Sequence, residues 1–194
     1  MRQRTKWVAL AALMVPPGPV EPARLAACRS TWSALRQDPK AVHALRAWGP
    51  DCAWLGRGND RLQTTPDGCG AAALAAMLRR HGRTVPQRLL WTACHLPHGG
   101  TNLGRLASTA RGFGLEPTVG FTAEFAALPV PAIVHLRRGH FVVLDAWTPP
   151  FAVVFDPGCG RVRVHGTALR DAASGAVLCA HAAPHTSVAL EVDP

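Results

Sequence analysis

Apolar residues recur at the spacing of an α-helix in the segment that follows residue 70. Leu74 and Met77 lie on the apolar face of this segment, and Gly82 comes after it. Such a stripe predicts a helix, and a glycine just beyond it is typical of a helix end. The same spacing predicts a helix over residues 102–112, and residues 85–96 can form a further short helix.

The pattern changes to that of β-strands after Pro131. The short apolar runs are AIVHL, HFVVLDAW, FAVVFD and RVRVH, with the turn segments RRG, TPP and PGCG between them. Runs of Val, Ile and Phe bounded by Gly and Pro are typical of an antiparallel meander. Helices followed by a sheet predict the α+β fold class.

The composition is that of one folded domain with an extension. Of the 194 residues, 48% are hydrophobic and 17% are charged, which excludes a disordered chain. The formal net charge is +9, but the arginines are scattered, tyrosine is absent and aromatic residues make up only 6%. A nucleic-acid binder usually has a basic stripe with interleaved aromatics, so we expect no nucleic-acid partner. An arginine-rich binder of an acidic surface stays an alternative.

The first residues have the pattern of an export signal. MRQRTK is basic, WVALAALMV is apolar but too short to span a bilayer, and a proline-rich segment occupies residues 16–24. The segment LAAC, ending at Cys28, is similar to a lipoprotein cleavage box, although Glu21 and Arg24 interrupt the apolar run before it. We therefore expect an exported or membrane-associated, extracytoplasmic protein, and leave lipidation of Cys28 open. An apolar start helix without an export role is the alternative.

Three parts of the chain differ in character. We expect residues 1–27 to be a signal peptide or membrane-targeting segment, 28–61 a helical N-terminal extension, and 62–194 the catalytic domain. Asp38-Pro39 interrupts the helical composition of the extension, because the residue before a proline is driven away from the helical conformation.

Six cysteines are consistent with disulfides in an exported protein. If Cys28 is lipidated and Cys69 is kept aside, the other four can form two pairs: Cys52, Cys94, Cys159 and Cys179. Cys and His also gather near His95 and His181, but without the paired spacing of structural zinc sites. We therefore expect no metal, and the pairing of the cysteines stays open.

The stretch Asp67-Gly68-Cys69-Gly70 places a cysteine between two glycines at the start of the first predicted helix. Asp67 is a suitable N-cap, which makes Gly68 the first helical residue. Unpaired amide hydrogens and the positive end of the helix dipole favour a thiolate there, and thus a nucleophile near neutral pH. The glycines leave space for a substrate backbone. The alternative is a small, buried cysteine at a tight turn.

His140 and Asp156 are predicted to lie together. If residues 140–147 and 151–156 pair as a hairpin, Asp156 lies opposite Val142 and on the same sheet face as His140. A carboxylate there can accept the Nδ1 proton of the imidazole and leave the other nitrogen to take the proton of the thiol. The alternative is that Asp156 merely opens a turn, for which Asp-Pro-Gly is typical.

These motifs together resemble the bacteriocin-processing peptidase family. The matching segments, in order, are Gln63 followed by Cys69-Gly70, a helix ending RRHG, GGTNLGRLASTARGFGLEP, LPVPAIVHLRRGHFVVLDAW and FDPGCGRV. The resemblance covers about residues 62–164 and implies a papain-like cysteine peptidase that cuts after a double glycine. The implied α+β fold has N-terminal helices, with the nucleophile on a helix start, packed on a C-terminal antiparallel sheet. By resemblance, Cys69, His140 and Asp156 form the catalytic triad, and Gln63 helps to form the oxyanion hole.

Members of that family are usually the N-terminal domain of an ABC exporter. The sequence contains no Gly-rich phosphate-binding loop ending in Lys-Ser or Lys-Thr and no membrane-spanning bundle, so we expect a stand-alone peptidase that acts with a separate exporter. Its expected substrate is a peptide or protein, and no cofactor is expected. Two alternatives stay open: a catalytically inactive peptide-binding module of the same fold, and a thiol acyltransferase in which an amine replaces water.

Overall fold

A seven-stranded antiparallel sheet forms the centre of the molecule, whose computed structural model describes residues 38–182. The strand order across the sheet is β1-β6-β5-β4-β3-β7-β2. The strands are β1 (Ala53–Trp54), β2 (Leu115–Phe121), β3 (Ala132–Leu136), β4 (His140–Thr148), β5 (Phe151–Asp156), β6 (Gly160–His165) and β7 (Ala173–Ala182).

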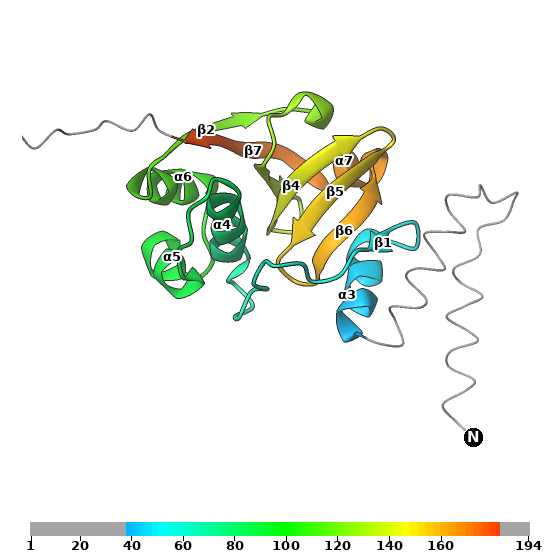
Figure 1. Cartoon of the computed structure of the whole chain (residues 1–194), viewed down its shortest axis with the longest axis horizontal. Coiled ribbons are helices and arrows are strands. Elements are labelled where there is room, and N and C mark those ends of the chain that lie inside the picture. Colours follow the sequence, from blue (N-terminus) through cyan, green and yellow to red (C-terminus); the bar gives the residue numbers. More distant parts are fainter. Residues whose placement is uncertain (1–37, 183–194) are drawn as a thin grey trace, which may run out of the picture.

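Helices pack on both faces of this sheet. They are α3 (Pro39–Trp48), α4 (Cys69–Arg80), α5 (Gln87–Cys94), α6 (Leu103–Gly112), the 3-10 turn η1 (Phe125–Ala127) and α7 (Gly166–Ala172). Helices α4, α5 and α6 lie together beside the sheet (Figure 1) and pack on the face that presents Ile133 and Val143. The opposite face presents Val134 and Val142 to α3 and α7. Because successive strand residues point to opposite faces, runs of consecutive apolar residues are what this two-sided burial requires.

The predicted α+β class is confirmed, and most of the predicted elements are present. The helices predicted over 102–112 and within 85–96 are α6 and α5, and the four predicted strands are β3 to β6. Strands β4 and β5 form the predicted hairpin, in which Val143 lies opposite Phe155. The register shifts by a bulge beyond Leu144. Strands β1, β2 and β7, the 3-10 turn η1 and helix α7 were not predicted.

Helix α4 starts one residue later than the sequence analysis predicted. Its first residue is Cys69 and its N-cap is Gly68, with no side chain bonded to the first turn. Asp67 is therefore not the N-cap. Its carboxylate turns instead toward Thr65 and lies 3.5 Å from the Nδ1 of His95. The intervening glycine moves the acid too far from the first turn to accept its amide hydrogens.

The other end of α4 is closed by its own backbone. Gly82 takes a left-handed conformation with φ of +74°, and the amide of Arg83 donates to the carbonyl of Leu78 at 2.9 Å. This bond, with the one from Gly82 to Arg79 at 3.0 Å, is the usual glycine-terminated helix end, and Gly82 ends the helix as predicted.

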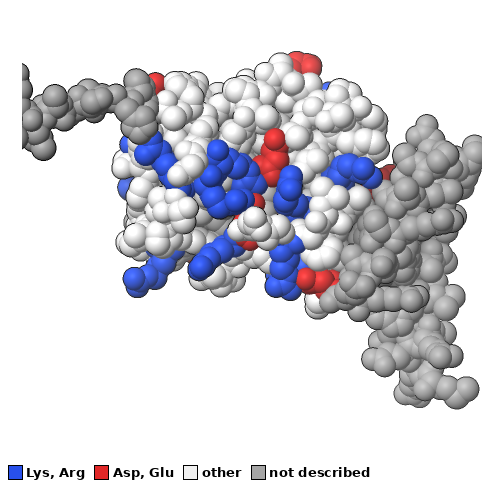
Figure 2. Space-filling view, viewed as in Figure 1, with Lys and Arg blue, Asp and Glu red and all other residues white. Residues whose placement is uncertain are grey.

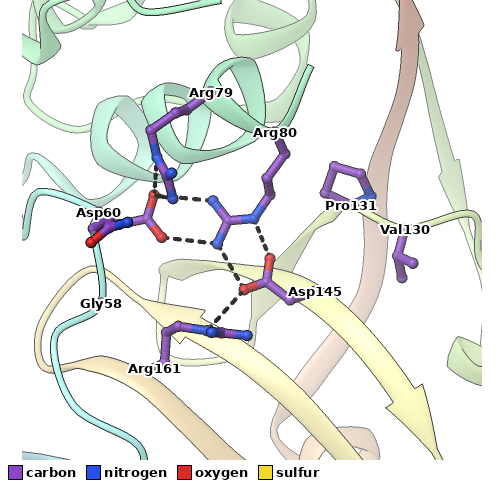
Figure 3. A pocket seen from close by; sticks show the side chains of 9 residues that line it. Gly58, Asp60, Arg79, Arg80, Val130, Pro131, Asp145 and Arg161 are labelled. Carbon is purple, nitrogen blue, oxygen red and sulfur yellow. Dashed lines mark hydrogen bonds and ion pairs between the residues drawn. The ribbon is translucent and has the colours of Figure 1, made fainter. Parts of the chain in front are cut away.

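Arg80 ties the C-terminal end of α4 to the sheet (Figure 3). Its guanidinium donates to both oxygens of Asp60, to both oxygens of Asp145 on β4, and to the carbonyl of Ala76. All five N–H donors of the arginine are therefore used. Arg79 adds two bonds to Asp60, of 3.0 Å and 2.8 Å. Figure 2 shows that Lys and Arg side chains gather on one face of the molecule with acidic side chains among them.

The N-terminal extension contributes to the folded domain. Helix α3 begins at the Asp38-Pro39 break that the sequence predicts, since the Asp38 carboxylate accepts the amide of Lys40 at 2.9 Å and Pro39 is the first helical residue. Strand β1 pairs with β6 at one edge of the sheet. The domain boundary at residues 61 and 62 stays a prediction.

The two disulfides that the cysteine count would allow are not formed. Cys94, Cys159 and Cys179 carry free thiols. Cys94 packs with α4 on one face of the sheet and Cys159 lies in the core on the other face, so the two thiols are kept apart.

The predicted signal peptide and Cys28 lie outside the described residues. Within residues 38–182 no helix is long and apolar enough to cross a membrane.

Candidate active site

Close packing explains the glycine that follows Cys69. A Cβ atom on Gly70 would lie 2.2 Å from the Cγ2 of Thr101, far inside van der Waals contact. A Cβ atom on Gly68 would lie 2.8 Å from the Oγ1 of Thr65. The two glycines therefore let the start of α4 approach the loops that flank it, and Cys69 is held at a fixed place between them.

The surroundings of Cys69 favour its thiolate. Burial alone would raise the pKa of the thiol, because the side chain is only 8% exposed. A hydrogen bond to His140 and the charge of that imidazole, with the backbone amides of Phe141 and Gly70, outweigh burial and lower the pKa of Cys69. The position at the first turn of α4 acts in the same direction.

His140 and Asp156 form a short hydrogen bond. The Nε2 of His140, at the start of β4, lies 2.7 Å from the Oδ1 of Asp156, at the end of β5. The predicted shared sheet face brings the two side chains together. The predicted atom is wrong, however, because the carboxylate faces Nε2 and not Nδ1. This leaves Nδ1 as the nitrogen for Cys69.

Asp156 is fully buried, with 0% of its surface exposed, and the protein supplies donors to both of its oxygens. Oδ1 also accepts the amide of Gly158 at 2.8 Å, and Oδ2 accepts the indole N–H of Trp48 at 2.9 Å. A terminal nitrogen of Arg138 lies 3.5 Å from Oδ2. Burial would raise the pKa of this carboxyl group, but the bonds from His140, Gly158 and Trp48 hold it below its usual value.

His140 is correspondingly basic. Burial would lower the pKa of the imidazole, but the hydrogen bonds and charges of Asp156 and Cys69 raise it to about 9. A thiol with a lowered pKa beside an imidazole with a raised one favours the thiolate–imidazolium pair at neutral pH.

Gln63 lies at the same cleft as Cys69. Its side-chain nitrogen donates to the carbonyls of Thr65 and Pro66 at 3.1 Å and 3.2 Å, and its backbone amide donates to the carbonyl of Pro157 at 2.9 Å. The backbone bond to Pro157 fixes the glutamine to the turn after Asp156. A substrate oxygen at this site would have to draw the side-chain amide away from the loop carbonyls.

The cleft that holds these groups has a volume of about 540 Å³. Cys69, His140 and Gln63 line it, together with residues of α3 and of three turns: His43, Arg46, Ala47, Pro66, Arg138, Gly139 and Gly158. A hollow of about 580 Å³ lies beside Arg80 and Asp145 (Figure 3), but its lining contains no nucleophile. The chemistry therefore belongs to the cleft at Cys69.

The sequence analysis did not identify Trp48 and Arg138 as neighbours of the triad. Arg138 lies in the predicted turn segment RRG, and nothing in the local pattern of α3 shows that its last residue faces Asp156. No group of three or more His, Cys, Asp or Glu side chains that could hold a metal occurs between residues 38 and 182.

Solved structures of peptidase domains have the same fold. The chain has a TM-score of 0.60 and 26% identity to a double glycine motif protease from an AMS/PCAT transporter in complex with the leader peptide, over 66% of this chain and 95% of that one. It has a TM-score of 0.57 and 18% identity to the peptidase domain of Streptococcus ComA, a bi-functional ABC transporter, over 64% of this chain and 98% of that one. The N-terminal peptidase C39 like domain of a toxin secretion ATP-binding protein from Vibrio parahaemolyticus gives a TM-score of 0.54 and 19% identity, over 61% of this chain and 99% of that one.

None of the curated proteins compared with the chain matches it. The sequence model of the Peptidase C39 family matches residues 59–185, which is well over half of the chain and includes the cysteine, the histidine and the aspartate described above. The resemblance drawn from the motifs is thereby confirmed. The chain belongs to the Peptidase C39 family.

Proposed function

We propose that the protein is an active cysteine peptidase that cleaves leader peptides after a double glycine. The observation that carries the proposal is the arrangement of Cys69, His140 and Asp156. A thiol with a lowered pKa lies beside an imidazole that a buried carboxylate holds at 2.7 Å. A buried structural cysteine would need neither partner, and its pKa would be raised, as it is for Cys94.

In the proposed reaction the Cys69 thiolate attacks the carbonyl carbon of the peptide bond that is cut, and the carbonyl π electrons move to its oxygen. When this tetrahedral intermediate collapses, the C–N bond breaks and the His140 imidazolium gives its proton to the leaving amine. A thioester on Cys69 remains. His140, now neutral, takes a proton from water, and the resulting hydroxide attacks the thioester. The carboxylic acid product leaves and the thiolate–imidazolium pair is restored.

Asp156 keeps His140 in one orientation during both steps, and it stays ionised because its pKa is lowered. The backbone amide of Cys69 lies in the first turn of α4, where amide hydrogens have no helical partner. That amide and the side-chain amide of Gln63 are the proposed donors to the oxyanion. For Gln63 this role requires the exchange of a loop carbonyl for the substrate oxygen.

The double-glycine preference and the leader-peptide substrate are proposed by analogy to the protease described as a double glycine motif protease in complex with a leader peptide. Export or membrane attachment, and action with a separate exporter, are likewise proposals. They rest on the basic and apolar pattern of the first residues and on the family.

The proposal is tested with a peptide library that includes double-glycine sequences. The library is incubated with the protein or with Cys69→Ala, and the products are read by mass spectrometry with and without an added amine. The proposal predicts hydrolysed products after Gly-Gly from the first protein and none from the second. Amine adducts in place of hydrolysed products would indicate the acyltransferase. Tight peptide binding without any product would indicate the inactive binding module.

A further inference from the structure

Helix α3 lies outside the region that the family model matches. That region begins at residue 59, whereas α3 spans Pro39–Trp48. The last residue of α3, Trp48, is 7% exposed, and its indole N–H donates to the Oδ2 of Asp156 over 2.9 Å. A segment added in front of the family domain thus contacts the acid of the triad directly.

Helix α3 is fixed to both turns that carry the acid and the base. On the Asp156 side, the Nζ of Lys40 donates to the carbonyl of Gly158 at 2.9 Å. A Cβ atom on Gly158 would lie 2.8 Å from the Nε2 of His43, so the helix and this turn are in close contact. On the His140 side, Arg138 donates to the carbonyl of Ala47 at 2.9 Å.

The bond from Trp48 meets a specific need of Asp156. A fully buried carboxylate must have donors on both oxygens, because an unpaired buried charge is costly. Oδ1 is occupied by His140 and Gly158. Oδ2 has Trp48 at 2.9 Å, and its other neighbour, Arg138, is half exposed and lies at 3.5 Å. Trp48 is therefore the short, buried contact that fixes the second oxygen.

We propose that Trp48 is a positioning residue of the active site, which makes α3 part of the catalytic unit. Its N–H fixes Oδ2, the carboxylate then cannot rotate, and Oδ1 stays aimed at the Nε2 of His140. The inference rests on the proposed function for its effect on turnover. Its effect on the reactivity of Cys69 does not depend on any substrate.

Without the indole donor, the carboxylate can turn and its bond to His140 weakens. The His140 imidazolium is then held less firmly, and its positive charge stabilises the Cys69 thiolate less. The other ionisable groups that act on this site lie on several elements: Lys40 and His43 on α3, His135 on β3, Arg138 before β4, and Cys159 before β6. They are the same in the wild type and in the variant below, so a change in pH dependence reports the lost donor.

The test compares Trp48→Phe, which keeps an aromatic ring but lacks the donor, with Trp54→Phe. The indole of Trp54 also donates one bond, at 2.8 Å, but to the backbone carbonyl of Cys159. The rate of Cys69 alkylation by iodoacetamide is measured against pH, together with kcat and KM on a cleaved peptide and the melting temperature. The acid limb of the alkylation profile is expected to move to higher pH in Trp48→Phe and to stay in place in Trp54→Phe.

For turnover, loss of one bond to a buried charge is expected to lower kcat by about tenfold or more in Trp48→Phe, with KM changed by less than about twofold. The same acid limb in Trp48→Phe and the wild type would overturn the inference, and so would equal shifts in both variants. If the wild type cleaves no peptide, the proposed function fails, and the alkylation profiles still decide the role of Trp48.

Discussion

The Nε2 of His140 lies 2.7 Å from the Oδ1 of Asp156, and the two residues stand at facing ends of neighbouring strands. The pairing of Val143 with Phe155 sets this relationship, because it places the start of β4 beside the end of β5. The base and acid are thus fixed by sheet register. The nucleophile, Cys69, comes from the start of α4, which packs on the sheet face that presents Ile133 and Val143. The site therefore also depends on how α4 sits against the sheet.

At low pH the thiol of Cys69 is expected to react faster than the thiol of Cys179. Because His140 and nearby amides lower the pKa of Cys69, iodoacetamide should modify it at about pH 6. Cys179 is half-buried and burial raises its pKa, so it serves as the internal reference. Peptide mapping after a short exposure gives both rates. Equal modification of the two cysteines at this pH would show that Cys69 is not activated.

Stability should depend on pH through His140. Its pKa is raised from 6.5 to about 9 on folding, so its protonated form stabilises the folded state. This contribution is complete below the unfolded pKa and is lost as the pH rises through the folded one. The melting-temperature difference between the wild type and His140→Asn is therefore expected to shrink between about pH 7 and pH 9.5. A difference that stays constant over this range would contradict the assignment.

Substitution of Gly70 by alanine is expected to harm both stability and activity. The new Cβ would lie 2.2 Å from Thr101, so the start of α4 must shift and Cys69 must shift with it. The overpacking should cost about 1–3 kcal/mol in the free energy of unfolding. Gly112→Ala is the matched control, because that helical position has open space and should gain about 0.5–1 kcal/mol. Chemical denaturation measures both values.

Arg80 should be the most costly of the α4 arginines to replace. Arg80→Met leaves Asp60 and Asp145 without their central partner, and the side chains of these aspartates are only 2% and 9% exposed. The expected loss is about 3–5 kcal/mol in the free energy of unfolding. Arg79→Met is the control, since Arg79 is 40% exposed and contacts only Asp60, which keeps Arg80. Equal losses from the two substitutions would contradict the network in Figure 3.

Local pattern was enough to predict much of this fold and the meeting of His140 with Asp156. Helix α4 has a clear stripe with a glycine at its end, and β4 and β5 are joined by a short proline turn, so their register follows from chain order. The start of α4 was predicted one residue early, because Asp67 is a good cap by residue type, whereas its carboxylate in fact contacts Thr65 and the loop that contains His95.

Contacts between residues far apart in the sequence could not be predicted from local pattern. Strands β2 and β7 pair with each other across more than fifty residues of chain, and neither has a strong alternating pattern of its own. The contact of Trp48 with Asp156 spans 108 positions. No local spacing encodes such a contact. The imidazole atom that faces the carboxylate also depends on the final side-chain placement, which is why Nδ1 was predicted where Nε2 is found.

The central claim is that Cys69 is the nucleophile for a peptide carbonyl beside a double glycine. A peptidyl Gly-Gly chloromethyl ketone tests it most directly, because its ketone occupies the place of the carbonyl that is cut and its chloride is displaced by the attacking sulfur. The account predicts one equivalent of label, mapped to Cys69, slowed by His140→Asn and by competing double-glycine peptide. Absence of label, or label spread over Cys94, Cys159 and Cys179 without competition by the peptide, would contradict it.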